Sequence, residues 1–252
     1  MLPPNSIGRN PLTQRFTAIV RILNVDYPTN EELVAIYTEY FKALLKTKDM
    51  DMGFSTTLAQ FFIDAYNQIL SGFSVDTHRH YNFTPKHLFK MFKSIIKYDF
   101  TDKESLVEAL VNELFAHFRN KLVSQESKNK FEQMIFSLAK THFKFNLKGR
   151  QFFSVMSGKY QKIPKDDYIS IVKSSIIQYE RMYKPITFVY HDECLNQISS
   201  IEKALNEPDS ICLFGKSGMG RQTCLQIAAI IAKIDIVRIP NLRNCGPREF
   251  KK

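Results

Sequence analysis

A glycine-rich turn between an apolar run and a helical pattern constrains this chain more than any other feature. The turn reads Gly215-Lys216-Ser217-Gly218-Met219-Gly220-Arg221-Gln222-Thr223 and follows the apolar run 210–214. Apolar residues then recur at helical spacing from Leu225 to Ala232. A strand, a glycine-rich turn and a helix are the context of a phosphate-binding loop, because glycines let the backbone wrap around an anion and the helix start supplies free N–H groups.

The turn matches the phosphate-loop pattern G-x-x-x-x-G-K-[ST] only in part. Gly215 and Gly220 have the required spacing, but Arg221 replaces the lysine and Gln222 replaces the hydroxyl that would hold Mg²⁺. Thr223 brings a hydroxyl one residue late. Because arginine is a planar fork and not a compact ammonium, the pattern favours nucleotide binding over ATP hydrolysis. An ordinary glycine-rich turn between a strand and a helix is the alternative.

The composition favours a folded protein that binds neither nucleic acid nor a membrane. The chain is 44% hydrophobic with 21 Phe and 11 Tyr, which is ample for a packed core. The formal charge is +10, but the Lys and Arg residues are scattered and no nucleic-acid-binding motif accompanies them, so we expect no nucleic-acid partner. No apolar run approaches membrane-spanning length and no signal-peptide pattern is present, so we expect no membrane contact.

The cysteines and histidines do not have the spacing of metal ligands. The four cysteines are Cys194, Cys212, Cys224 and Cys245, and none forms a C-x-x-C pair. We therefore expect no metal site, and buried reduced thiols in a reducing compartment.

Residues 30–140 carry one helical pattern after another. Thr29 and Glu32 form a capping box before the first pattern, and Thr84-Pro85 supplies an N-cap and a proline at the first position of another. No strand pattern interrupts this block. Residues 141–165 are irregular, with turns at Gly149, Gly158 and Pro164, and a further helix follows Asp166-Asp167.

Strand patterns lie on both sides of the helical block. The runs 19–25, 186–190, 210–214 and 234–239 are short, apolar and partly β-branched. So few strands near each end would leave sheet faces and edges exposed. We therefore interpret the two ends as parts of larger α/β units, and the chain as a piece of a longer protein.

Three segments resemble the dynein heavy chains, a family of AAA+ motors. Gly8 to Arg21, with Val25-Asp26-Tyr27-Pro28, resembles the end of the large subdomain of the third AAA+ module. His80-Tyr81-Asn82-Phe83-Thr84-Pro85-Lys86-His87-Leu88 resembles the part of that module's helical lid that carries the sensor-2 position, and Phe214 to Thr223 resembles the Walker A loop of the fourth module. Arg15-Phe16-Thr17, taken with this loop, is similar to the second cytoplasmic class, the intraflagellar-transport dyneins.

The resemblance implies a mostly helical α/β AAA+ fold, in which a helical lid subdomain precedes the strand, P-loop and helix of a second AAA+ module. Residues 1–28 would end the large subdomain of the third module, and residues 29–165 would form the lid. Residues 166–185 would be a linker helix, and residues 186–252 would start the fourth module.

The resemblance also implies parts of several nucleotide sites. Arg15 would be an arginine finger, and Lys86 holds the sensor-2 position. ATP or ADP, with weakly held Mg²⁺, would bind at Gly215, Lys216, Ser217, Gly218, Met219, Gly220, Arg221, Gln222 and Thr223. Val189 and Tyr190 would begin the adenine pocket. The alternatives are solvent-exposed charges for Arg15 and Lys86, and ordinary core packing for Val189 and Tyr190.

The implied parent protein is an ATP-hydrolysing motor that moves toward microtubule minus ends, located in the cytoplasm, the cytoskeleton and the cilium or flagellum. Its partners would be the other AAA+ modules of the same heavy chain, the intermediate, light intermediate and light chains, and microtubules. This chain alone would bind nucleotide and relay conformation without catalysis, since it contains no Walker B pair after a strand. A non-motor AAA+-derived scaffold with a relic P-loop, and an independent P-loop ATPase, are the alternative interpretations.

Overall fold

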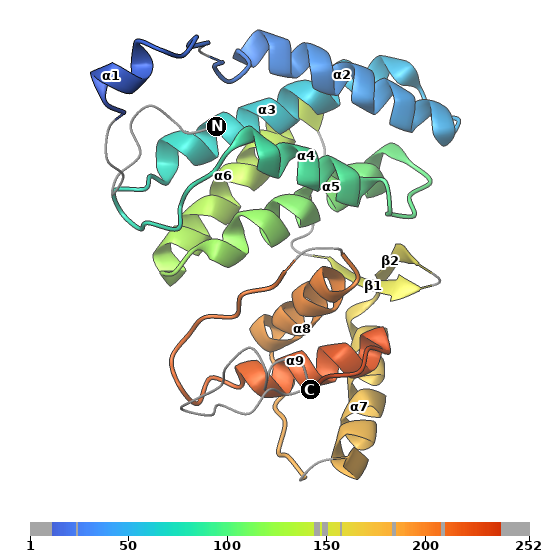
Figure 1. Cartoon of the computed structure of the whole chain (residues 1–252). Coiled ribbons are helices and arrows are strands. Elements are labelled where there is room, and N and C mark those ends of the chain that lie inside the picture. Colours follow the sequence, from blue (N-terminus) through green and yellow to red (C-terminus); the bar gives the residue numbers. More distant parts are fainter. Residues whose placement is uncertain are drawn as a thin grey trace.

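The computed structural model describes residues 12–23, 25–143, 147, 151–156, 158–182, 185–207 and 210–237. Helices α2 to α6 form an upper layer, helices α7 to α9 form a lower one, and a small β-hairpin lies between them (Figure 1). The elements are α1 (Gln14–Thr17), α2 (Asn30–Thr47), η1 (Met52–Phe54), α3 (Ser55–Gly72), α4 (Pro85–Ile95), α5 (Lys103–His117), η2 (Arg119–Lys121), α6 (Gln125–Phe143), β1 (Phe152–Met156), β2 (Lys159–Ile163), α7 (Lys165–Met182), α8 (Asp192–Leu205) and α9 (Arg221–Ala232).

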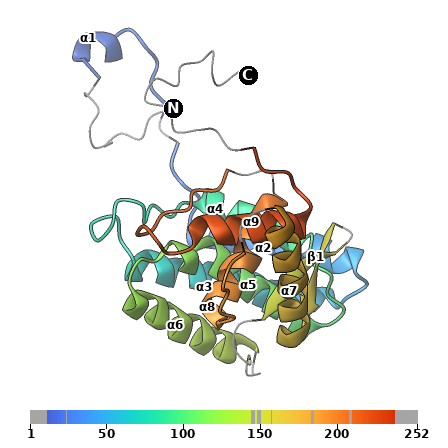
Figure 2. The same ribbon diagram turned by 90° about the horizontal axis from the view of Figure 1, so that it is seen from below.

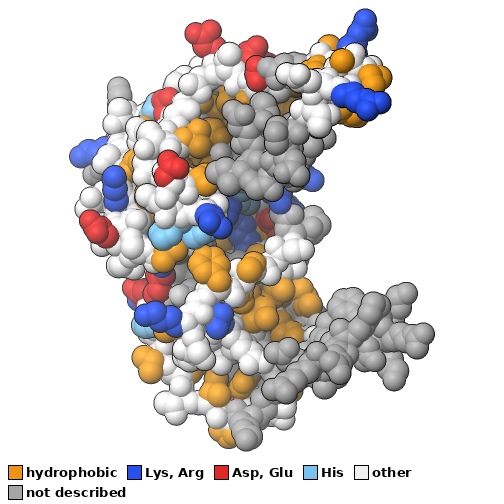
Figure 3. All heavy atoms as spheres, turned by 60° about the vertical axis from the view of Figure 1, so that its left-hand side comes forward, with side chains coloured by type: hydrophobic (Ala, Val, Ile, Leu, Met, Phe, Trp, Pro, Cys, Tyr) orange, Lys and Arg blue, Asp and Glu red, His pale blue; other side chains and the backbone are white. Residues whose placement is uncertain are grey.

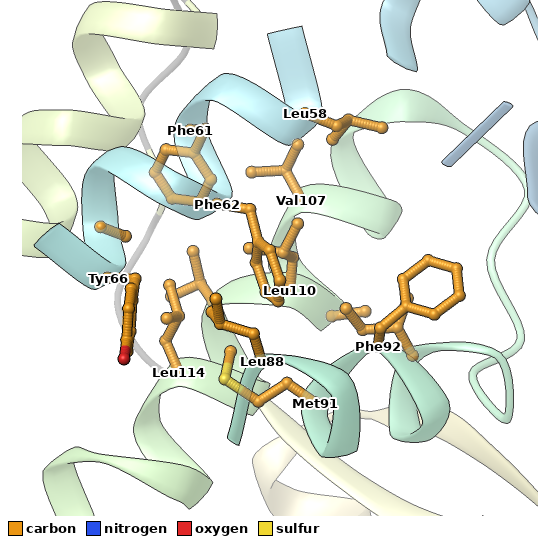
Figure 4. Packing of buried hydrophobic residues seen from close by; sticks show 14 of the residues in the cluster. Leu58, Phe61, Phe62, Tyr66, Leu88, Met91, Phe92, Val107, Leu110 and Leu114 are labelled. Atoms are coloured by element: carbon orange, nitrogen blue, oxygen red, sulfur yellow. The ribbon is translucent and has the colours of Figure 1, made fainter. Parts of the chain in front are cut away.

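The helical block of the sequence is confirmed as the upper layer. Thr29 caps α2: its hydroxyl accepts from the Glu32 N–H, and the Glu32 carboxylate accepts from the Thr29 N–H. Pro85 opens α4, as the sequence predicted, and α3 ends at Gly72. Aromatic and aliphatic side chains from α3, α4 and α5 converge in its core (Figure 4), where Phe62 meets the rings of Tyr37 and Phe41 edge to face.

The hairpin β1–β2 was not predicted, and it joins the two layers. Its strands are antiparallel, with Phe152 opposite Ile163 and Val155 opposite Tyr160. Because successive side chains of a strand point to opposite faces, Phe152 and Ile163 pack into the lower core while Phe153 and Tyr160 pack into the upper core. The signal in the sequence was the alternation of polar and apolar residues on both sides of Gly158, whose φ is +80°.

The lower core contains α7, α8, α9 and one face of the hairpin. Its buried apolar side chains are Phe152, Ile163, Tyr168, Val172, Ile176, Tyr179, Cys194, Leu195, Ile198, Ile201, Cys224, Ile227 and Ala228. Helix α9 packs along both α8 and α7. Residues 166–185 were expected to form a linker helix. Helix α7, which they form in part, contributes instead to the core that supports α9, the helix after the glycine-rich loop.

The expected strands outside the hairpin are not formed, which corrects that part of the sequence prediction. Residues 19–23, 25, 186–190, 210–214 and 234–237 belong to no helix or strand, while residues 24, 238 and 239 lie outside the described residues. Their composition suits a strand, but a strand also needs a neighbour to pair with its backbone N–H and C=O groups. Within the described part of the chain, none of these segments pairs with a second strand.

Helix α1 stands apart from the two layers (Figure 2). It is one short turn closed by the Thr13 side chain, and none of its residues is buried. Ile19, Leu23 and Val25, which follow it, are each more than three-quarters exposed. In the part of the chain that the structure describes, no helix has the length and apolar character needed to cross a bilayer.

Candidate phosphate-binding loop

The glycine-rich loop leads directly into helix α9, as the sequence predicted, but the strand expected before it at residues 210–214 is not formed. Gly218 and Gly220 have φ angles of +82° and +71°, in the left-handed region that side chains disfavour. Gly220 is the N-cap of α9 and makes no side-chain cap, while the Cys224 N–H donates to the Gly220 carbonyl at 2.9 Å and closes the first turn. The loop therefore ends at the start of a helix, where free backbone N–H groups and the helix dipole attract anions.

Arg221 turns back over the loop. Its guanidinium donates from Nη1 to the Leu213 carbonyl at 3.5 Å, and a Cβ placed on Gly215 would lie 3.5 Å from the Arg221 Cδ. Open space surrounds the Cα atoms of Gly218 and Gly220 on the side where a Cβ would project. The arginine thus covers one end of the loop, and the glycines leave the other end open to a ligand.

The remaining loop side chains face solvent. Lys216, Ser217, Met219 and Gln222 are exposed, and Thr223 is half-buried in the first turn of α9. The chemistry available is therefore that of backbone N–H donors with the cations Lys216 and Arg221 nearby, which suits a phosphate group. The hydroxyl of Thr223 comes one position late and the amide oxygen of Gln222 is neutral, so both make a poor Mg²⁺ site, since Mg²⁺ is usually held through carboxylates and phosphates in strict octahedral geometry.

The upper layer contacts the entrance of the loop through His80. The Phe214 ring lies 5.4 Å from the His80 ring, edge to face, and His80 Nε2 is 3.0 Å from the Lys121 carbonyl oxygen. Hydrophobic and histidine side chains lie side by side on this face of the molecule (Figure 3). The structure thus brings the His80–Leu88 segment and the glycine-rich loop, more than a hundred residues apart, to one surface.

The other predicted site residues lie on separate elements. Lys86 is exposed in the first turn of α4, and Arg15 is exposed on α1, away from the layers (Figure 2). Val189 is 71% exposed and Tyr190 is 36% exposed, so neither residue is buried in a core. Tyr190 contacts Phe188, and Lys173 lies over its ring at 5.7 Å. The structure gathers the loop residues at one place and does not gather the whole predicted set.

Helix α8 carries buried polar contacts that sequence reasoning missed. Glu202 accepts from the Ser154 hydroxyl at 2.5 Å, the Val155 N–H at 2.9 Å and the Tyr168 hydroxyl at 3.2 Å. Burial raises the pKa of Glu202, and these hydrogen bonds act in the opposite direction. The sequence signal was weak: two adjacent charged residues inside an otherwise amphipathic helix.

The next residue, Lys203, is buried and reaches into the upper core. Its ammonium forms an ion pair with Glu113 of α5 and donates to the Tyr98 hydroxyl at 3.1 Å. Further along, Glu207 accepts from the Ser94 hydroxyl at 2.5 Å and from the Tyr160 hydroxyl at 3.2 Å. The C-terminal end of α8 therefore holds the hairpin and the upper layer together. The described residues contain no group of three or more His, Cys, Asp or Glu placed to hold a metal ion.

Most of the upper layer is similar to one known family. Residues 40–128, from within α2 to the start of α6, match the ATPase lid domain of dynein heavy chains. These residues are therefore similar to a dynein ATPase lid, as the resemblance of the His80–Leu88 segment implied.

Similarity to dynein heavy chains extends over nearly the whole chain. It is 25% identical over 267 residues to cytoplasmic dynein 2 heavy chain 1 of Chlamydomonas reinhardtii, covering 100% of this chain and 6% of that protein. It is 26% identical over 279 residues to the protein of the same name from Tripneustes gratilla, covering 98% and 6%. It is also 27% identical over 260 residues to the cytoplasmic dynein heavy chain of Paramecium tetraurelia, covering 98% and 6%. The chain is thus similar to one segment of these dynein heavy chains and spans about 6% of their length.

Proposed function

We propose that this chain is the part of a dynein motor ring that binds ATP or ADP at Gly215–Thr223 and couples that loop to the preceding lid. The observation that carries the proposal is the pair of left-handed glycines, Gly218 and Gly220, placed directly before α9. Residues other than glycine rarely adopt these φ angles, so it is the glycine at each position that permits this loop conformation. Phosphate groups are the ligands that such a loop suits best.

Coupling to the lid would pass through α8. This helix packs along α9, which carries the loop, and its end holds the lid through Lys203, Glu113 and Glu207. A displacement of α9 on nucleotide binding would therefore be transmitted to α8 and then to α5 and the hairpin. Dense packing favours such transmission, because packed helices shift as units and do not deform locally.

The wider role follows from the relatives. Several of them are named cytoplasmic dynein 2 heavy chains, and the proposal extends to ATP-driven, minus-end-directed movement on microtubules in cilia. In this role the partners would be other AAA+ modules of the same heavy chain, the intermediate, light intermediate and light chains, and microtubules. Arg15 and Lys86 would act in neighbouring nucleotide sites, and Val189 and Tyr190 would border the adenine. A non-motor scaffold with a relic loop is the competing function.

Nucleotide titration of the purified chain tests the proposal. We expect a fluorescent ATP or ADP analogue to bind the folded chain and to be displaced by unlabelled ATP. Gly220→Ala should reduce the affinity at least tenfold, because a φ of +71° strains alanine by about 1–2 kcal/mol and moves the loop N–H groups.

Gly72→Ala is the matched control, since Gly72 ends α3 without a left-handed angle and has open space around it. Circular dichroism would show that both variants keep their helices. A folded wild-type chain that binds no nucleotide at millimolar ATP would overturn the proposal and favour the relic loop.

A further inference from the structure

Two cysteines from different helices meet in the lower core. Cys194 is in the first turn of α8, and Cys224 is in the first full turn of α9. Their sulfur atoms are 3.9 Å apart and hydrogen-bonded, and the two residues are only 9% and 5% exposed. A disulfide requires an S–S distance of about 2.0 Å, so the sulfurs are about 2 Å from bonding distance, which side-chain rotation can supply.

The surroundings favour a thiolate at Cys224. Both cysteines lie at helix N-termini, whose dipoles stabilise negative charge. The hydrogen bond between the thiols lowers the pKa of Cys224 to about 7 and raises that of Cys194, while burial opposes ionisation of both. The titratable groups next to Cys194 are His191, whose Nδ1 accepts the Cys194 N–H at 3.2 Å, and Tyr168.

We propose that Cys194 and Cys224 are a peroxide-responsive dithiol whose disulfide ties α8 to α9 directly behind the glycine-rich loop. The oxidant is hydrogen peroxide, which is small enough to reach nearly buried sulfurs. The Cys224 thiolate attacks one peroxide oxygen, the O–O bond breaks, and hydroxide leaves as water after taking up a proton, which gives a sulfenic acid. The Cys194 sulfur then attacks the Cys224 sulfur, the S–O bond breaks, and a second water leaves with the Cys194 proton. Two thiols lose two electrons and two protons, and one peroxide becomes two waters.

The bond would restrain the start of α9. The Cys224 N–H already donates to the Gly220 carbonyl, so the disulfide would anchor the helix turn that ends the loop. Formation of the disulfide depends only on the two sulfurs, so this inference stands or falls independently of nucleotide binding.

Peptide mapping of the intact 252-residue chain tests the proposal. The folded chain is treated with hydrogen peroxide, denatured, alkylated with iodoacetamide and digested without reduction. We expect a cross-linked peptide pair containing Cys194 and Cys224, with two of the four cysteines protected from alkylation and dithiothreitol restoring both. The loop that the bond closes is long, so oxidation should raise the thermal midpoint by roughly 5–10 °C.

Two variants sharpen the test. Cys224→Ser should abolish the cross-link. Cys212→Ser, at an exposed cysteine just before the glycine-rich loop, should leave it unchanged. Alkylation of all four cysteines after peroxide treatment would overturn the proposal, as would a cross-link through Cys212. A cross-link that forms only in denaturant would overturn it as well. The wild-type mapping decides the question even if a serine variant fails to fold.

Discussion

Lys203 of α8 and Glu113 of α5, ninety residues apart in the sequence, form a buried ion pair at the boundary between the two layers. The Lys203 ammonium also lies over the rings of Tyr98 and Tyr160, at 5.3 and 5.4 Å from their centroids. A charge inside a core is costly unless it is paired and hydrogen-bonded. This pair therefore fixes where the end of α8 can dock on the lid.

The first prediction concerns this pair. Lys203→Met should destabilise the chain by about 3–5 kcal/mol, because it leaves the buried Glu113 carboxylate without its ammonium partner and with only the His117 ring beside it, 3.4 Å away. The double variant Lys203→Met, Glu113→Leu should recover most of that loss. Chemical denaturation followed by circular dichroism measures both.

The control for the ion pair is an exposed one. Lys165 and Asp192 are also paired, with side chains 49% and 69% exposed. Lys165→Met should therefore cost less than about 1 kcal/mol. Equal losses for Lys203→Met and Lys165→Met would show that the buried pair has no special role.

The second prediction is a pH dependence that arises at His87. Burial, followed by the charge of Lys121, lowers the pKa of His87 to about 4, with His117 and Lys90 adding to the effect. The unfolded chain binds this proton near pH 6.5 and the folded chain only near pH 4, so stability is complete above about pH 6.5 and falls as the pH decreases to 4. Because His87 is half-buried, we expect a loss of about 1–2 kcal/mol and not the full linkage value.

His87→Gln separates this effect from other acid-sensitive groups. His87 completes the capping box of α4, where its Nδ1 accepts the Thr84 N–H at 3.1 Å. Glutamine can accept the same hydrogen bond without titrating. The variant should be about as stable as wild type at pH 7.5 and should lose less stability between pH 6.5 and 4. Identical pH profiles for the two proteins would contradict the assignment to His87.

The third prediction tests the core of the lid. Phe62 is fully buried (Figure 4) and its ring packs against those of Tyr37 and Phe41. Phe62→Ala should lower the free energy of unfolding by about 3–5 kcal/mol, through lost transfer energy and the cavity it leaves. Phe89→Ala, at a residue 48% exposed on α4, should cost less than half as much. Urea titration of both variants makes the comparison.

The fourth prediction separates the charge of Arg221 from the backbone of the loop. Arg221→Gln should weaken nucleotide binding by about tenfold, since it removes a charge-assisted hydrogen bond worth about 1–2 kcal/mol. Arg221→Lys keeps the charge and should change the affinity less than threefold. Arg181→Gln, on the exposed end of α7, is the control. A tenfold loss in the Arg181 variant would indicate that net charge, and not the position of Arg221, governs binding.

The fifth prediction is that this chain binds ATP without hydrolysing it. Gln222 stands where a hydroxyl would hold Mg²⁺ in a phosphate-binding loop, and phosphoryl transfer needs metal, cradle and a water-positioning group together. Phosphate release from Mg²⁺-ATP should therefore stay at background for wild type and for Arg221→Lys. Turnover that disappears in Gly220→Ala would prove the prediction wrong.

The sequence alone was sufficient for the long helices and for the glycine-rich turn before α9. Thr29, Pro85 and Gly72 mark helix ends through chemistry that acts over a few residues, namely side-chain caps, a fixed proline φ and a flexible glycine. Gly218 and Gly220 likewise have the left-handed angles that their lack of a Cβ permits. Local signals of this kind can be interpreted without knowing what lies nearby in space.

Only the tertiary structure decided which apolar segments pair and which charges meet. Residues 210–214 have the composition of a strand yet form none in the described chain, while 152–156 and 159–163 pair because each finds the other across a turn. The ion pair of Lys203 with Glu113 and the approach of Cys194 to Cys224 depend on how α8 docks between the lid and α9. Such contacts join residues far apart in the chain, and no local pattern encodes the packing that brings them together.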